Sequence, residues 1–301
     1  MIKKLRAFLS GLCSGRRGGR TSSFTEGRSA AARWPGFGLT LGLSLTYMTL
    51  LILIPLSALV LYSTKLRAAE FAAVIFDPRT LAAFKISFGS ALCAALINAV
   101  AGLIIAWVLV RFKFPLKRFI DACIDLPFAI PTAVAGISLA TVFSPQGAAG
   151  KVLALFGINA GFSRSGIVIA LIFITLPFVV RTIQPVLEEF DRELEEAAAS
   201  LGANYTQIFT RVIMPSIFPA LITGTAMAFA RALGEYGSII FISSNMPYES
   251  EIVPLLIIKK LMQFDYKGAS ALGITMLATA FVMLFITNFL QNWLRKSRSK
   301  V

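Results

Sequence analysis

The chain has 301 residues, of which 56% are hydrophobic and only 15% are charged. Soluble domains average about 45–50% apolar and about 25% charged residues, so this composition is that of a membrane protein. It disfavours a soluble enzyme, a secreted disulfide scaffold and a nucleic-acid binder. Uncharged runs of about the 20 residues that span a bilayer support this interpretation. They are 34–64, 86–110, 126–150, 212–230 and 268–294.

We interpret the chain as an all-α polytopic membrane protein with six transmembrane helices inside a permease domain over 37–296. The expected helices span residues 38–62, 82–110, 119–143, 165–187, 216–242 and 270–293. Proline removes a backbone donor, so Pro127 and Pro131 are expected to loosen the third helix.

The net charge of +14 reflects basic segments whose position predicts the orientation. Eighteen of the 29 Lys and Arg residues lie in an arm over 1–36, in the loops after the second and fourth helices, and in a tail over 295–301. The positive-inside rule then places both termini in the cytoplasm. We expect the arm to be disordered and to contact lipid; its composition also resembles a chloroplast transit peptide, which leaves the chloroplast envelope as a minor alternative.

Few residues in the chain are of the kinds that bind metals, cofactors or nucleotides. Histidine is absent, and Cys13, Cys93 and Cys123 show no metal-ligand spacing. A Walker-type phosphate-binding loop is also absent from the sequence. We therefore expect no catalytic residue, no metal and no cofactor in this subunit.

The predicted loop over 188–215 breaks the charge pattern, because it is acidic where bases are expected. Its composition favours a helix over 188–201, a turn at Gly202 that frees the chain to take a left-handed conformation, and a short helix over 203–213 before Pro215. Such an elbow fits either an interfacial hairpin or a docking surface for a soluble partner. Six acids lie within nine positions: Glu188, Glu189, Asp191, Glu193, Glu195 and Glu196.

The same loop resembles the E-A-A-x-x-x-G-x9-I-x-L-P signature of bacterial ABC importer permeases. The chain has Glu196-Ala197-Ala198, then Gly202, then Val212-Ile213-Met214-Pro215, with Val and Met in place of Ile and Leu. The resemblance implies the type I, MetI-like architecture and a loop that docks on an ATP-hydrolysing subunit. The residues it assigns to coupling are Glu195, Glu196, Ala197, Ala198, Gly202 and Pro215.

Four further segments, 125–143, 176–189, 231–242 and 263–271, resemble the CysT-type sulfate/thiosulfate permeases. This resemblance implies a subunit that forms half of a translocation pathway in the bacterial inner membrane. Its implied partners are a homologous CysW-type permease, two CysA-type subunits that bind ATP and Mg, and a periplasmic sulfate/thiosulfate-binding protein. A molybdate/tungstate permease is the nearest alternative. From other classes, a secondary anion transporter and a membrane-bound redox enzyme remain as rivals.

Candidate residues of the translocation path lie in the third and fifth helices. Arg231 and Glu235 are four residues apart, so they can form an ion pair, although Arg231 could instead attract a dianion. Asp121 and Asp125 are expected to anchor one end of the third helix near the basic residues that follow the second, and Arg181 to extend toward the membrane surface. The full set of path or gating candidates is Pro127, Pro131, Thr132, Arg231 and Glu235.

Overall fold

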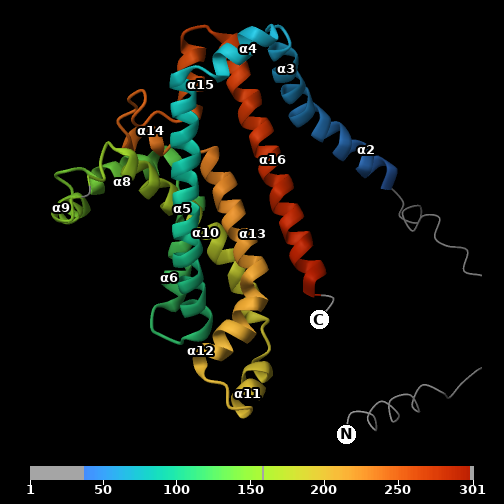
Figure 1. Cartoon of the computed structure of the whole chain (residues 1–301), viewed down its shortest axis with the longest axis vertical. Helices are drawn as coiled ribbons and strands as arrows, with labels where there is room; N and C mark the ends of the chain where they lie inside the picture. The colour runs from blue at the N-terminus through green and yellow to red at the C-terminus, as the bar shows by residue number, and fades with distance from the viewer. Residues whose placement is uncertain (1–36, 158, 299–301) are drawn as a thin grey trace, which may run out of the picture. The chain divides into compact units, whose positions relative to one another are not determined.

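The computed structural model describes residues 37–157 and 159–298, and every regular element in that part of the chain is helical (Figure 1). The predicted arm over 1–36 and the end of the predicted tail lie outside the described residues. Five described segments are long and apolar enough to cross a membrane. They are Phe37–Ser63, Pro78–Arg111, Arg164–Glu188, Tyr205–Leu233 and Tyr266–Thr287.

The first of these segments consists of α2 (Phe37–Met48), η2 (Thr49–Leu53) and α3 (Ile54–Ser63). The described chain divides into two compact units, one over 37–55 and one over 56–298. The later helices are α4 (Ala68–Ile75), α5 (Pro78–Arg111), α6 (Lys117–Ile124), α7 (Leu126–Ala129), α8 (Thr132–Phe143), α9 (Ala148–Leu155), α10 (Arg164–Glu188), α11 (Arg192–Ser200), α12 (Tyr205–Ile208), η3 (Phe209–Ile213), α13 (Met214–Leu233), α14 (Ile239–Ile242), α15 (Val253–Met262) and α16 (Tyr266–Arg298).

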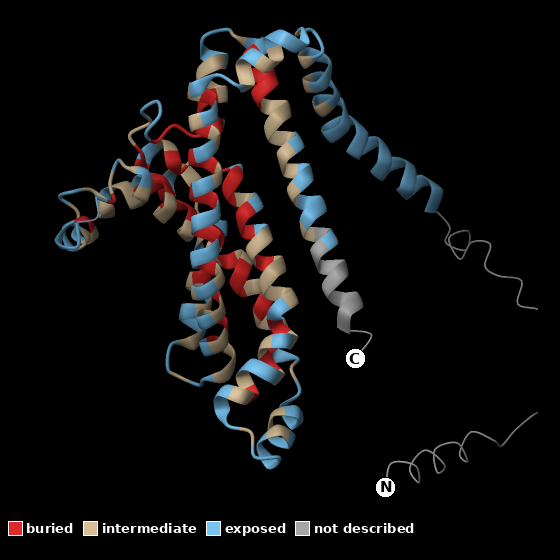
Figure 2. Ribbon diagram, in the orientation of Figure 1, coloured by how far each residue is buried: buried red, intermediate tan, exposed pale blue. Residues whose placement is uncertain are grey.

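Three long helices, α5, α10 and α13, pack against one another and bury much of the apolar core (Figure 2). A Cβ added to Gly102 would lie 2.7 Å from Cγ1 of Val179, so α5 and α10 approach closely there. The fully buried Asn98 joins the same helices by donating to the Ile172 carbonyl (3.0 Å) and the Thr175 hydroxyl (2.9 Å). Small residues and interhelical hydrogen bonds are what association inside a bilayer requires.

The predicted third span, 119–143, is not one continuous helix; it is broken at the two prolines expected to loosen it. It consists of α6, α7 and α8, of which α8, a predominantly apolar helix of 12 residues, is the longest. Pro127 lies in the first turn of α7, and Pro131 is the N-cap of α8 with ψ of 132°. Because proline cannot donate to the preceding turn, the helix ends and restarts at these positions.

The predicted fifth span, 216–242, also differs from the structure at both ends. Its helix starts at Tyr205 and ends at Leu233, after which Gly234 is the C-cap and the short α14 follows. Pro215 therefore lies within a continuous helical segment, directly after the π-helical turn η3. There the Met214 N–H bonds the Phe209 carbonyl five residues earlier, so the turn widens just before the residue that lacks a donor.

The two broken helices meet at α8 and α14. A Cβ added to Gly136 of α8 would lie 2.5 Å from the carbonyl oxygen of Ser238, and one added to Gly237 would lie 2.3 Å from the Thr132 hydroxyl. The contact therefore depends on glycine on both sides. It holds α8 against the segment where α13 ends.

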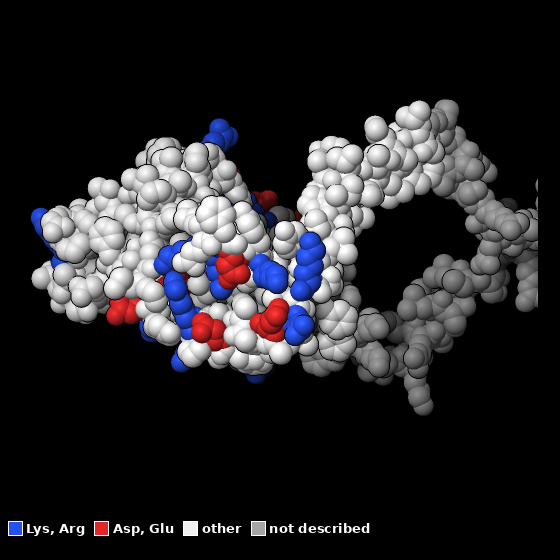
Figure 3. Space-filling model, turned by 90° about the horizontal axis from the view of Figure 1, so that it is seen from above, with Lys and Arg blue, Asp and Glu red and all other residues white. Residues whose placement is uncertain are grey.

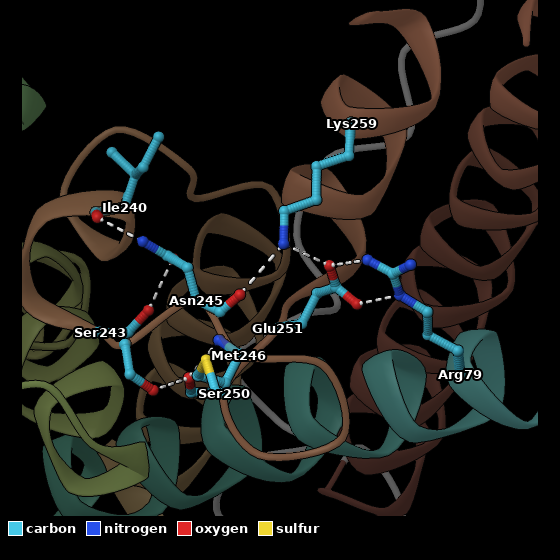
Figure 4. Close-up of polar contacts among 9 residues, drawn as sticks. Arg79, Ile240, Ser243, Asn245, Met246, Ser250, Glu251 and Lys259 are labelled. Atoms are coloured by element: carbon cyan, nitrogen blue, oxygen red, sulfur yellow. Dashed lines mark hydrogen bonds and ion pairs between the residues drawn. The ribbon is translucent and has the colours of Figure 1, made fainter. Parts of the chain in front are cut away.

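One end of the second unit carries α11 and α12, and the opposite end carries α4 and α15 (Figure 1). Viewed from the α4 and α15 end, Lys and Arg side chains lie next to Asp and Glu side chains (Figure 3). At this end of the unit, the carboxylate of Glu251, whose side chain is only 1% exposed, bonds to two cations. Arg79 donates to its carboxylate through Nε and Nη2, both at 2.7 Å, and Lys259 donates at 2.7 Å (Figure 4).

Two opposing effects act on the pKa of Glu251. Burial raises it, whereas the hydrogen bonds from Arg79 and Lys259 lower it, and the net pKa lies below the ordinary value of 4.5. A carboxylate with a lowered pKa stabilises the fold above its ordinary pKa, and that stabilisation is lost as the pH falls through the folded-state value. The cluster therefore ties α5 to α15 at neutral pH.

We predict that Gly136→Ala lowers the thermal unfolding midpoint of the purified protein in detergent by about 3–10 °C. The added methyl would collide with the Ser238 backbone, and overpacking of this kind costs about 1–3 kcal/mol. Gly42→Ala is the matched control, because its Cβ would meet nothing within 4 Å. Equal midpoints for the two variants would contradict the close contact of α8 with Ser238.

We also predict that Glu251→Gln reduces the free energy of unfolding by about 1–3 kcal/mol at pH 7, because two cations lose their carboxylate. The difference from wild type should begin to shrink as the pH falls below the ordinary value of 4.5, because the carboxylate is then protonated in the unfolded chain before it is protonated in the folded one. Thermal unfolding at pH 7 and pH 4 measures both effects. Glu249→Gln, an exposed change two residues away, should match wild type; a pH-independent loss in Glu251→Gln would contradict the ionic account.

Candidate coupling and translocation sites

The elbow between α10 and α13 has the helix–turn–helix form that its sequence predicts. Asp191 caps α11 by accepting the Glu193 N–H at 2.9 Å. Gly202 has φ of 86°, so the predicted left-handed turn is confirmed. Asn204 and Gln207 then cap α12 reciprocally, with bonds of 2.9 and 3.0 Å. Local side-chain chemistry thus fixes both sides of the turn.

The two candidate acids of the elbow point to different surroundings. Glu195 is half-buried and pairs with Arg111 at the end of α5. The Arg111 guanidinium also lies 5.0 Å from the Trp107 ring, which adds a cation–π contact. Glu196 is exposed. Glu195 therefore fixes the elbow to the bundle, whereas Glu196 is free to contact a partner.

The remaining candidates of the elbow divide in the same way. Ala197 is exposed, while Ala198 is half-buried and its carbonyl accepts the Ala203 N–H at 3.1 Å across the turn. Pro215 lies ten residues along the helix that begins at Tyr205, away from the turn itself. The structure therefore brings Glu195 through Gly202 together and leaves Pro215 apart from them.

Two large apolar side chains that the sequence analysis does not single out flank the turn. Leu201 is 89% exposed and Tyr205 is 93% exposed. Beside them, a groove of about 540 Å³ lies between α5 and the elbow, lined by Trp107, Phe209 and Tyr205 among others. Exposed apolar groups around an acidic helix are typical of a surface that a protein partner covers. In the sequence, the one indication of this surface is that Leu201 and Tyr205 lie within three residues of Gly202.

Arg181 connects α10 to the broken third span. It donates to Asp125 at 2.8 and 2.6 Å, to Asp121 at 2.7 Å, and to Gln184 at 2.6 Å. The two aspartates thus anchor this end of the third span through Arg181, and the Arg181 side chain does not extend freely toward the membrane surface. A charge at this depth is stabilised by nearby carboxylates, and the aspartates from α6 are within reach.

The predicted ion pair of Arg231 and Glu235 is confirmed, with Nη1 and Oε2 at 2.7 Å. Glu235 is buried and also accepts the Ser238 N–H at 3.0 Å and the Ser238 hydroxyl at 3.1 Å. It therefore satisfies the backbone where α13 ends and α14 begins. Thr132 lies beside Gly237 in this region, whereas Pro127 lies earlier in the chain, in α7, next to Phe128, whose ring packs on α10.

Metal ligands do not cluster in the described part of the chain, where no three Asp, Glu, Cys or His side chains lie together. Cys93 and Cys123 are free thiols, and Cys13 lies outside the described residues. The elbow therefore offers a contact surface, and the ion pairs of Arg181 and Arg231 hold the broken helices in place.

Comparison with known proteins places the chain among transport subunits. The family model described as "Binding-protein-dependent transport system inner membrane component" matches residues 98–300. The sulfate transport system permease protein CysT of Escherichia coli is 46% identical over 258 residues, which cover 86% of this chain and 93% of that protein. The CysT protein of Synechococcus elongatus is 49% identical over 247 residues, covering 82% and 89%.

Solved structures share the fold at low sequence identity. A subunit of a bacterial alginate ABC transporter, solved in complex with an alginate-bound periplasmic protein, has a TM-score of 0.71 at 18% identity and covers 84% of this chain and 92% of that one. A chain of the MetNI methionine ABC transporter in an inward-facing conformation has a TM-score of 0.54 at 15% identity, covering 69% and 93%. The chain thus belongs to the family of binding-protein-dependent transport system inner membrane components, the permease subunits of ABC importers.

Proposed function

We propose that this chain is the permease subunit of an ATP-driven importer of sulfate and thiosulfate, in which it forms half of the translocation pathway. The observation that carries the proposal is the identity of 46–49% to sulfate permeases along almost their whole length. The elbow around Gly202, which keeps the E-A-A loop of ABC permeases, supports the ATP-driven mechanism.

The proposed complex contains a second, CysW-type permease, two CysA-type ATP-binding subunits and a periplasmic binding protein for sulfate and thiosulfate. ATP and Mg would be bound by the CysA-type subunits, so no cofactor or catalytic residue is assigned to this chain. The complex lies in the inner membrane with both termini of this chain in the cytoplasm. The elbow end then faces the ATPase, and the α4 and α15 end faces the periplasm.

The proposed mechanism is alternating access driven through the elbow. Tyr205 begins a helical segment that continues without a break to Leu233, about 40 Å at 1.5 Å per residue. A displacement of the elbow is therefore passed along one rigid element to the Arg231–Glu235 pair, where the helix ends against α8. The ion pair of Glu195 with Arg111 couples the same displacement to α5.

Two alternatives are distinguished by uptake measurements. A secondary anion transporter would use a titratable acid deep in the spans, but Glu235 is paired with Arg231 and hydrogen-bonded to Ser238. In proteoliposomes that contain the full complex, we expect sulfate uptake to require ATP and the binding protein. Sulfate uptake that continues without the ATPase would refute the proposal. A complex that takes up molybdate but not sulfate would favour a molybdate/tungstate permease.

We predict that Gly202→Val and Glu196→Lys leave the chain in the membrane at near-normal levels but abolish sulfate uptake and stimulated ATP hydrolysis. Valine at φ of 86° costs about 1–2 kcal/mol, and lysine reverses the charge of an exposed acid. Co-purification of the ATPase with tagged permease measures docking directly. Gly157→Val is the matched control, since Gly157 has φ of 72° and open space around it but lies away from the elbow. If Gly202→Val retains the ATPase as Gly157→Val does, the loop is only a connector.

A second prediction concerns the exposed apolar pair at the turn. The double variant Leu201→Ser and Tyr205→Ser should weaken binding of the ATPase by at least about tenfold, because truncating a buried interface aromatic costs about 2 kcal/mol or more. Titration of the purified ATPase onto the permease in nanodiscs gives the dissociation constant. Leu155→Ser in α9, where leucine is 84% exposed, should bind as wild type does. An unchanged constant in the double variant would exclude these side chains from the interface.

A further inference from the structure

A cavity of about 420 Å³ lies between the first half of α5 and the start of α10, near the α4 and α15 end. Its lining includes Lys85, Gly89 and Ser90 from α5, Arg164 from α10, and Tyr248 from the loop after α14. Two cations and two hydroxyl-bearing residues thus surround one space. This cavity is separate from the elbow and from the break between α13 and α14.

Lys85 lies within the candidate span Pro78–Arg111, seven residues and about 10 Å along α5 from its start, and it is exposed. Charges within spans are costly and usually paired. Arg181 and Arg231, which also lie within spans, both bond to carboxylates. By contrast, Lys85 makes no ion pair or hydrogen bond among the residues that the structure describes. Its positive charge is therefore available to a ligand in the cavity.

Arg164 adds a second positive charge, and its guanidinium forms no ion pair in the described chain. Its guanidinium donates to the backbone carbonyls of Tyr248, at 2.7 Å, and Glu249. Carbonyl groups hold the side chain in place but leave its net charge unchanged. Tyr248 itself has φ of 66°, so the loop takes a left-handed turn to present these carbonyls. The arginine is thus a positioned cation at the wall of the cavity.

We propose that this cavity binds the transported anion, a tetrahedral oxyanion dianion such as sulfate, during its passage through the permease. Lys85 and Arg164 would balance its two charges, and the hydroxyl of the buried Ser90 would donate a hydrogen bond. The cavity is much larger than the roughly 30 Å³ that one water molecule occupies, so the ion would be held together with water. Such a site binds weakly, as a transit site requires. The inference rests on the proposed function for the identity of the anion.

The test is equilibrium binding of radiolabelled sulfate to the assembled permease and ATPase complex, without binding protein, in nanodiscs of phosphatidylcholine. Lys85→Gln should raise the dissociation constant at least about tenfold, since a charged hydrogen bond is lost, and Lys85→Arg should restore most of the affinity. Lys267→Gln, an exposed lysine near the same end but outside the cavity lining, is the control of equal charge change. Wild-type affinity in Lys85→Gln would overturn the site.

A second pair of variants tests the site without removing Lys85. A Cβ at Gly89 would meet nothing within 4 Å, and position 89 lies one helical turn from Lys85. Gly89→Glu therefore places a carboxylate beside the lysine and should abolish sulfate binding, whereas Gly89→Gln, of the same shape, should bind within about threefold of wild type. Equal binding by the two variants would contradict an electrostatic site.

The phosphodiester of an anionic lipid is also a tetrahedral oxyanion, with one negative charge, and further measurements separate the two sources. Native mass spectrometry of wild type and Lys85→Gln in phosphatidylglycerol shows whether a lipid is retained through Lys85. Lys85-dependent lipid retention, with sulfate binding unchanged in Lys85→Gln, would overturn the proposal in favour of a lipid site. ATP-dependent sulfate uptake by the wild-type complex tests the proposed function separately. If the complex takes up no sulfate, that function is refuted, and the binding measurements still decide whether the cavity binds an oxyanion.

Discussion

A bilayer offers neither water nor counter-ions to a buried charge, and this constraint explains why three arginines near the ends or breaks of spans pair with carboxylates. Arg111 with Glu195, Arg181 with two aspartates, and Arg231 with Glu235 each brace a place where a helix ends or breaks. Each pair therefore combines two tasks, since it neutralises a charge and fixes an irregular backbone segment. The elbow, the broken third span and the end of α13 are held by the same kind of interaction.

These braces lie along one mechanical route. The elbow is attached to α5 through Glu195, and it continues into the helical segment that ends at Leu233. That end is capped by Glu235 and packs against α8 through Gly136 and Ser238. A partner that moves the elbow would thus move the two broken helices with it, while the Asn98 contacts hold α5 on α10 near the centre of the bundle.

Features set by neighbouring residues could be predicted from the sequence, and features set by distant contacts could not. The apolar runs predict most of the spans, the left-handed turn at Gly202 follows from its local sequence, and the i,i+4 spacing of Arg231 and Glu235 predicts their ion pair. Arg181 bonds to Asp125, which lies 56 residues earlier in the sequence, and no local pattern indicates this contact. Lys85 already lies inside the predicted helix over 82–110, but no local pattern indicates that Arg164 and Tyr248 line the same cavity.

The most direct test of the coupling account is the accessibility of a cysteine at position 205, introduced in a chain whose three native cysteines are replaced by serine. A membrane-impermeant maleimide is applied to inside-out membrane vesicles that contain the permease with or without its ATPase. Labelling should be rapid for the permease alone and at least about tenfold slower in the assembled complex, since docking would bury this side chain. Labelling at the same rate in both preparations would contradict the assignment of the elbow as the ATPase docking surface.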